Sequence, residues 1–172
     1  MASLAAAIVL LGALSLALFQ NWRSALPFSP PTVEREEKGA DATKETGKAP
    51  AARFATINGQ RFNLEVADDN AKRTMGLSQR AIIPEDLAML FVFPWEDVWR
   101  FWMKDMLVPL DVIFLDPTYR IVDIQTMQIQ PGAPDSQLQI YTPAASALYA
   151  LEINGGLAER FGFQVGMTVQ LQ

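Results

Sequence analysis

The domain is organised around the stretch Val98-Trp-Arg-Phe-Trp-Met-Lys-Asp-Met-Leu-Val-Pro-Leu-Asp-Val-Ile-Phe-Leu-Asp116. We predict that this stretch forms a strand, a turn and a second strand. Large apolar side chains alternate over residues 98–103, which is the pattern of a strand with one buried face. Pro109 has no backbone N–H, so it belongs at the start of the second strand. Residues 110–115 are apolar on both faces, which predicts a strand that is covered on both sides.

Charged residues interrupt these apolar segments at three places, Lys104, Asp111 and Glu152. A buried charge is costly unless it is paired. We therefore expect Asp111 to lie inside the domain and to pair with Lys104 or Arg80. The alternative is that Asp111 is solvated in the turn at Pro109. The three charged residues either form ion pairs that fix the strand register or surround one cleft in which their titration is shifted.

The composition excludes several kinds of site. The 172 residues contain neither cysteine nor histidine. This excludes disulfides, Ser-His-Asp and Cys-His catalysis, and the usual zinc and copper sites. We expect no cofactor and no metal site, and any metal that did bind would be a hard ion held by oxygen atoms. The net charge of −5 argues against a nucleic-acid partner, because such a partner requires a basic surface.

The first 52 residues are expected to lie outside the folded domain. Residues 2–19 carry no charged side chain and reach the lower limit, about 17–25 residues, for a membrane span. Residues 1–20 are therefore a membrane anchor or a cleaved secretory signal, with a buried soluble helix as the third possibility. Residues 21–52 contain four prolines, five basic residues and five acidic residues, so we expect a disordered linker. Residues 53–172 form the domain, which we expect in a membrane-anchored or exported protein on the periplasmic side.

The domain shows the sequence signals of a β-rich α+β fold. Asn58-Gly59 is a strong signal for a type I′ hairpin, and Asp68 or Asp69 can cap a short helix that runs through Met75. The expected strands are 54–57, 62–66, 88–93, 98–103, 110–115, 119–127, 147–153 and 168–171, and the second helix is 157–161. We therefore predict a curled antiparallel or mixed sheet, or a partial barrel, with two short helices.

Aromatic side chains and a glycine pair are further candidates for a binding site. Trp95 and Trp102 could form a platform for a flat ligand. Trp99 and Phe101 are expected in the core, because they alternate as the buried face of a strand does. Gly155-Gly156 could offer backbone N–H groups to an anion, although a tight turn between a strand and a helix explains the pair equally well.

Five short motifs resemble those of one known family. They are Gly76-Leu77-x-x-Arg80, Met89-Leu90-Phe91-x-Phe93, Phe101-Trp102-Met103-Lys104, Pro109-Leu110-Asp111 and Leu151-Glu152-x-x-Gly155-Gly156. Together they resemble the bacterial and archaeal family called domain of unknown function 192, over about residues 54–172. The resemblance implies a compact β-rich domain, often exported behind a signal or anchor, with no established activity. With the glycine pair it points to the candidate binding residues Arg80, Trp102, Met103, Lys104, Asp111, Glu152 and Gly155.

Three function classes remain open on this basis. The first is a membrane-tethered or exported domain that binds a small ligand or an envelope partner through its Trp, Lys, Asp and Glu cluster. The second is a hydrolase-type enzyme with Asp111 or Glu152 as general acid or base. The third is an assembly factor that acts only by docking. No apolar face outside residues 2–19 obviously needs covering, so we expect a monomeric domain that meets the membrane through that segment.

Overall fold

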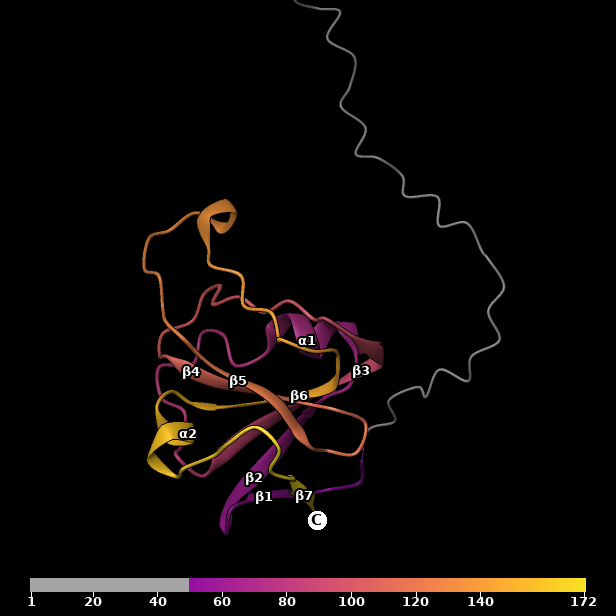
Figure 1. Cartoon of the computed structure of the whole chain (residues 1–172). Helices are drawn as coiled ribbons and strands as arrows, with labels where there is room; N and C mark the ends of the chain where they lie inside the picture. The colour runs from indigo at the N-terminus through magenta and orange to yellow at the C-terminus, as the bar shows by residue number, and fades with distance from the viewer. Residues whose placement is uncertain (1–49) are drawn as a thin grey trace, which may run out of the picture. The chain divides into compact units, whose positions relative to one another are not determined.

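The computed structural model describes residues 50–172 (Figure 1). The predicted hydrophobic helix in residues 1–20, and residues 21–49 of the predicted linker, lie outside the described part. Within residues 50–172, no helix is both long enough and apolar enough to cross a membrane.

Seven strands form one curled sheet of mixed strand direction, a half-barrel. Its order is β5-β4-β6-β3-β2-β1-β7. The strands β2 and β3 are parallel, and the other neighbouring pairs are antiparallel. The strands are β1 (Phe54–Ile57), β2 (Gln60–Ala67), β3 (Leu87–Asp97), β4 (Leu110–Leu115), β5 (Ile121–Met127), β6 (Ala147–Asn154) and β7 (Gln170–Leu171). This architecture confirms the predicted α+β class and the curled mixed sheet.

Two short helices, α1 (Asn70–Met75) and α2 (Leu157–Arg160), lie on opposite sides of the sheet (Figure 1). The first connects β2 to β3, because parallel neighbours need a crossover rather than a hairpin. As predicted, α1 is capped by Asp69, whose carboxylate accepts a hydrogen bond of 2.8 Å from the Lys72 backbone N–H. A 3-10 turn, η1 (Asp135–Gln137), lies in the long loop between β5 and β6, which projects away from the sheet in Figure 1.

The predicted hairpin between β1 and β2 is confirmed by its backbone. Asn58 and Gly59 have φ angles of 48° and 79°, so both adopt the left-handed conformation that a type I′ turn requires. The turn pairs Ile57 with Gln60 and Ala55 with Phe62. Because the side chains of Ala55, Ile57 and Phe62 are buried, this register places one face of the hairpin in the core.

The sheet is apolar on both faces, as the sequence of β4 predicts. One face of β4 places Ile113 in a core cluster with Leu90, Leu151 and the α2 residue Leu157. The other face places Val112 and Phe114 in a second cluster, whose further members include Met89, Phe91, Phe93, Phe101 and Met103. All six residues of β4 are buried. The second cluster is the one that carries the groove described below.

The predicted strand over residues 98–103 is wrong. The preceding strand, β3, continues through Pro94 to Asp97, whereas 98–103 lies outside the sheet and makes one isolated bridge, between Phe101 and Tyr141. Pro94 is tolerated within β3 because the pairing with β6 is irregular between Val92 and Asp97, so no regular ladder bond is lost there. The alternating side chains of 98–103 therefore reflect a segment that packs one side onto the sheet.

Candidate groove and its buried carboxyl group

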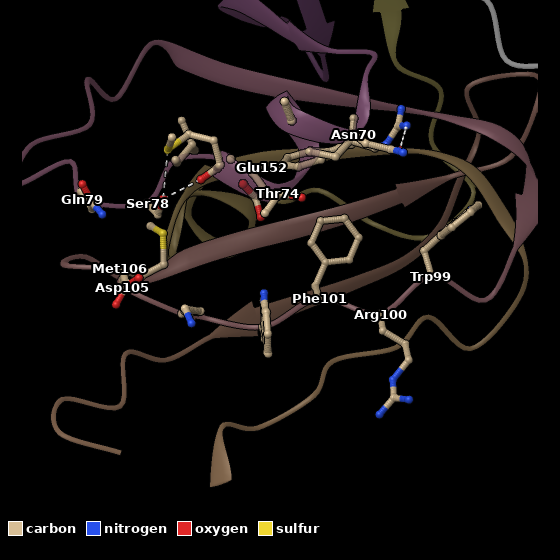
Figure 2. Close-up of a pocket in the computed structure, with 18 of the residues that line it drawn as sticks. Asn70, Thr74, Ser78, Gln79, Trp99, Arg100, Phe101, Asp105, Met106 and Glu152 are labelled. Atoms are coloured by element: carbon tan, nitrogen blue, oxygen red, sulfur yellow. Dashed lines mark hydrogen bonds between the residues drawn. The ribbon is translucent and has the colours of Figure 1, made fainter. Parts of the chain in front are cut away.

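A groove of about 870 Å³ runs over the second core cluster. One wall is α1 with the turn that follows it, residues 76–79, and the other is the segment 99–106. The floor comes from β3 and β6. Figure 2 shows Glu152 and Thr74 in the middle of the groove, with residues toward both ends: Ser78, Gln79, Asp105 and Met106 at one end, Asn70 and Trp99 at the other.

Aromatic packing holds the 99–106 wall against the sheet. The Trp99 ring stacks on Phe93 at a centroid distance of 4.2 Å, and its indole N–H donates to the Ala147 carbonyl oxygen at 3.0 Å. The Phe101 ring meets Phe91 edge to face at 5.3 Å. Backbone hydrogen bonds of 2.9 Å in both directions then tie Phe101 to Tyr141. These contacts give the groove a rigid aromatic side.

The opposite wall depends on the turn that ends α1. Gly76 has a φ angle of 51°, a conformation that L side chains rarely adopt. A Cβ atom at this position would lie 3.4 Å from the Phe91 ring and 3.9 Å from Glu152 Oε2. On α1 itself, the Arg73 guanidinium donates to the Val92 carbonyl oxygen and to the Asn70 side chain, each at 2.6 Å. This wall therefore passes close over the Glu152 carboxyl group.

Glu152 is the buried ionisable group of the groove. It lies on the interior strand β6, where its cross-strand neighbours are Met89 and Val112. Its side chain is 5% exposed, and it makes no hydrogen bond or ion pair with any residue in 50–172. Burial raises the pKa of the Glu152 carboxyl to about 8. At neutral pH the group therefore mainly carries a proton, and it can both donate and accept a hydrogen bond in the groove.

The mouth of the groove carries exposed aromatic and cationic side chains. Trp102 is 46% exposed, and the Lys104 ammonium lies 5.8 Å from the centre of its ring. Lys104 also forms an ion pair with Asp135 of η1, and this hydrogen bond raises the pKa of Lys104. Arg100 is exposed, and in Figure 2 its side chain points away from Phe101 and Glu152.

Three of the candidate binding residues line this groove: Trp102, Lys104 and Glu152. Arg80, Met103, Asp111 and Gly155 do not. Arg80 instead forms a bidentate pair with Glu65 at 2.9 and 2.7 Å, and this hydrogen bond lowers the pKa of Glu65. The Met103 side chain is 2% exposed and belongs to the core.

Asp111 lies inside the domain as predicted, but its predicted pairing with Lys104 or Arg80 is wrong. Its carboxyl group is fully buried and accepts two hydrogen bonds, from the Thr126 hydroxyl at 2.7 Å and from the Ala158 backbone N–H at 2.8 Å. Ala158 belongs to α2, on the side of the sheet opposite the groove. Asp111 therefore ties α2 to β4.

Gly155 has a packing role in the turn that follows β6. Its backbone N–H donates to the Pro109 carbonyl oxygen at 2.9 Å. A Cβ atom at Gly155 would come within 3.0 Å of the Pro109 carbonyl carbon. Since its N–H is already bonded within the protein, Gly155 does not offer that donor to an anion, and the tight-turn alternative describes this glycine.

Sequence reasoning missed the α1 side of the groove. The lining residues on that side that it did not single out as candidates include Asn70, Arg73, Thr74, Ser78 and Gln79. A usable signal existed, because Asn70, Arg73 and Thr74 are spaced three and four residues apart and so share one face of a helix. In residues 50–172, no group of three or more acidic side chains gathers in a way that could hold a metal ion.

Comparisons with known proteins identify relatives of the whole domain. The family model DUF192, described as "Uncharacterized ACR", matches residues 53–171. The UPF0127 protein PH1112 of Pyrococcus horikoshii is 33% identical over 112 residues, which are 62% of this chain and 85% of that protein.

Two solved structures are similar as well. One is a protein of unknown function from Novosphingobium aromaticivorans, with 29% identity and a TM-score of 0.59 over 77% of this chain and 99% of the other. The second is a Sinorhizobium meliloti protein proposed to be a transcription regulator, with 29% identity and a TM-score of 0.58 over 70% of this chain and 91% of the other.

Proposed function

This chain belongs to the DUF192 family, and we propose that its domain binds a small ligand in the groove between α1 and residues 99–106. The proposal rests on Glu152. This carboxyl group lies at the floor of an aromatic-walled groove and makes no hydrogen bond with residues 50–172. Its oxygen atoms keep some accessible surface there, so they are open to a hydrogen bond from a ligand. An apolar groove with a few convergent polar groups is the usual form of a ligand site.

The volume of the groove suits a small molecule better than a macromolecule. Ligand pockets typically measure about 300–1,000 Å³, and the groove measures about 870 Å³. A nucleic-acid partner is not favoured, because residues 53–172 carry nine basic and fourteen acidic side chains. The ligand is therefore a small molecule or a short segment of an envelope partner.

A groove-filling variant tests this proposal. Thr74 is exposed on α1 and lines the groove, so Thr74→Phe places a ring in the groove without disturbing the core. Lys72 is also exposed on α1 but does not line the groove, which makes Lys72→Phe the matched control. In a thermal-shift screen of the full chain, a bound ligand raises the melting midpoint by mass action. We expect this rise to be lost in Thr74→Phe and kept in Lys72→Phe. Hits that survive both substitutions place binding elsewhere and overturn the proposal.

We propose further that the domain is held outside the cytoplasm by residues 1–20. This proposal is supported by the uncharged segment 2–19, which is followed by the polar residues 21–52. Protease added to intact spheroplasts is then expected to degrade the domain. A domain that is fully protected until the spheroplasts are lysed contradicts this topology.

If the domain is an enzyme, Glu152 is still a candidate for its general acid or base, but Asp111 is not. A carboxyl group with a pKa near the working pH is suited to general acid–base catalysis, and the pKa of Glu152 is raised to about 8 by burial. Asp111 is separated from the groove by the sheet and has both oxygen atoms hydrogen-bonded. Chemical conversion of a groove ligand by the wild type, abolished in Glu152→Gln, would favour the enzyme over the binding protein.

A further inference from the structure

The geometry of the groove points to the class of its ligand: we propose that Glu152 recognises an organic ammonium group attached to an apolar, preferably aromatic, body. This inference rests on the proposed function of the groove and specifies the head group that reaches its floor.

Hydrogen-bonding capacity favours a group with several donors. Both oxygen atoms of Glu152 lack a hydrogen bond from residues 50–172, and its cross-strand neighbours Met89 and Val112 have no side-chain N–H or O–H to offer. An ammonium group has three N–H donors. It can therefore satisfy both carboxylate oxygens at once, whereas a ligand carbonyl group would use only a single carboxylic acid proton.

The aromatic walls favour a cation over an anion. The rings that line the floor and one wall belong to Phe91, Phe93, Trp99 and Phe101. Aromatic faces carry negative potential and attract ammonium groups, an effect that grows when water is excluded. The apolar remainder of the ligand would bury its surface against the same rings.

The other charged groups of the groove are Arg73 on α1 and Arg100, Lys104 and Asp105 on the segment 99–106. Lys104 is paired with Asp135 of the long loop. Arg73 is bonded to Asn70, at the end of the groove where Figure 2 also shows Trp99. Asp105 lies at the opposite end. The strands β3, β4 and β6 bring no further charged side chain to the groove lining. An ammonium group is therefore best placed at Glu152 and away from the Arg73 end.

Binding of an ammonium ligand should release the proton that Glu152 carries. Below the pKa of about 8, Glu152 is mainly a neutral acid. Binding of R–NH₃⁺ then gives the pair Glu152–COO⁻···⁺H₃N–R and releases one proton to the buffer. The ionised fraction of Glu152 increases about fiftyfold from pH 6 to pH 8, and the apparent affinity for an ammonium ligand should follow it. A neutral ligand that accepts the Glu152 proton would show the opposite trend.

The test uses three probes that share a phenyl body and differ in their head group: phenethylamine, 2-phenylethanol and 3-phenylpropionate. Alkylamines titrate near the lysine value of about 10.4, so the amine stays charged below about pH 9. We expect the full chain to bind phenethylamine best, with an affinity that rises about fiftyfold from pH 6 to pH 8 and with release of about one proton at pH 6.5, measured by calorimetry in two buffers. Glu152→Gln should weaken binding and abolish the pH dependence.

The control variant is Glu159→Gln, which removes an exposed carboxylate on α2 outside the groove and should leave binding unchanged. Circular dichroism and thermal melts establish that both variants are folded. If 2-phenylethanol or 3-phenylpropionate binds more tightly than phenethylamine and competes with other groove ligands, the ammonium inference is overturned while the groove remains a binding site. A pH dependence that persists in Glu152→Gln, or no binding of the amine at millimolar concentration, also overturns it. Ligand hits that survive the Thr74→Phe substitution would overturn the proposed function of the groove instead.

Discussion

Asp111 and Glu152 lie one register position apart on the neighbouring strands β4 and β6, but their carboxyl groups point to opposite faces of the sheet. Asp111 is the cross-strand partner of Ile153, and Glu152 is the partner of Val112. Successive side chains of a strand alternate between the faces, so Asp111 meets α2 and Glu152 meets the groove. The two buried carboxyl groups therefore cannot act as one acid–base pair, and each has its own consequence for stability.

The stability of the domain should depend on the protonation of Glu152. Its pKa is about 8 in the folded protein and near the ordinary glutamate value of 4.5 when unfolded. Between these values the folded state binds more protons, so this contribution to stability is complete below pH 4.5 and is lost as pH rises through 8. We expect the free energy of unfolding of the wild type, measured in urea at pH 5, 6.5 and 8, to fall by about 3–5 kcal/mol from pH 5 to pH 8 relative to that of Glu152→Gln.

Glu152→Gln is the internal control for that experiment, because its amide has a similar shape and does not titrate. Other carboxylates also change protonation with pH, and their contributions are common to both proteins. The difference between the two free energies of unfolding therefore isolates Glu152. A difference that stays constant from pH 5 to pH 8 contradicts the raised pKa.

Asp111→Ala should destabilise the domain strongly and leave the groove intact. The substitution removes the acceptor of the buried Ala158 N–H and of the Thr126 hydroxyl. An unsatisfied buried donor costs about 1–3 kcal/mol, and the cavity adds to that. We expect a total of about 3 kcal/mol in urea unfolding. Thr126→Ala removes one of the two bonds and should cost about 1 kcal/mol. A loss of ligand affinity in folded Asp111→Ala would show that the two faces are coupled.

Much of the fold could be predicted because the deciding signals are local. Asn58-Gly59 encodes its turn through two left-handed residues, and Asp69 caps α1 through an acceptor three residues from its donor. The apolar run of β4 predicts burial on both faces, and burial in turn identifies Asp111 as an interior residue. Each of these inferences depends on residues that are close in sequence.

The hydrogen-bond partner of Asp111 could not be predicted, because it depends on residues that are far apart in the sequence. The sequence shows charged side chains such as Lys104 and Arg80, but it does not show which backbone N–H groups are free in space. The backbone donor that Asp111 uses is the Ala158 N–H, 47 residues away. The strand predicted over 98–103 failed in a related way, because alternation of apolar and polar residues also describes a segment that packs on a sheet without joining it.

Gly155→Ala should destabilise the domain by close approach to Pro109. A Cβ atom would lie 3.0 Å from the Pro109 backbone and side chain, and relief of such overlap costs about 1–3 kcal/mol. The neighbouring Gly156 provides the comparison, because a Cβ atom there meets nothing within 4 Å but the φ angle is 85°. Gly156→Asn should therefore be tolerated better than Gly156→Ala, since asparagine adopts the left-handed conformation more readily. Thermal melts of the three variants measure this, and a Gly155→Ala protein as stable as the wild type contradicts the packing role.

The domain should fold without the first 49 residues but not without β1. This strand lies between β2 and β7, buries Ala55 and Ile57 completely, and begins where the Arg53 and Phe54 N–H groups both donate to the Gln172 carbonyl oxygen at 2.6 and 2.9 Å. A chain of residues 50–172 keeps all of these contacts and should be a soluble monomer with a single cooperative unfolding transition.

A chain of residues 58–172 loses an interior strand, exposes one edge of β2 and separates β7 from the sheet, so it should be unfolded or aggregated. Light scattering and urea unfolding of the two chains decide the matter. If residues 50–172 are soluble only when the preceding segment is restored, then that segment covers part of this domain and the division at residue 53 is wrong.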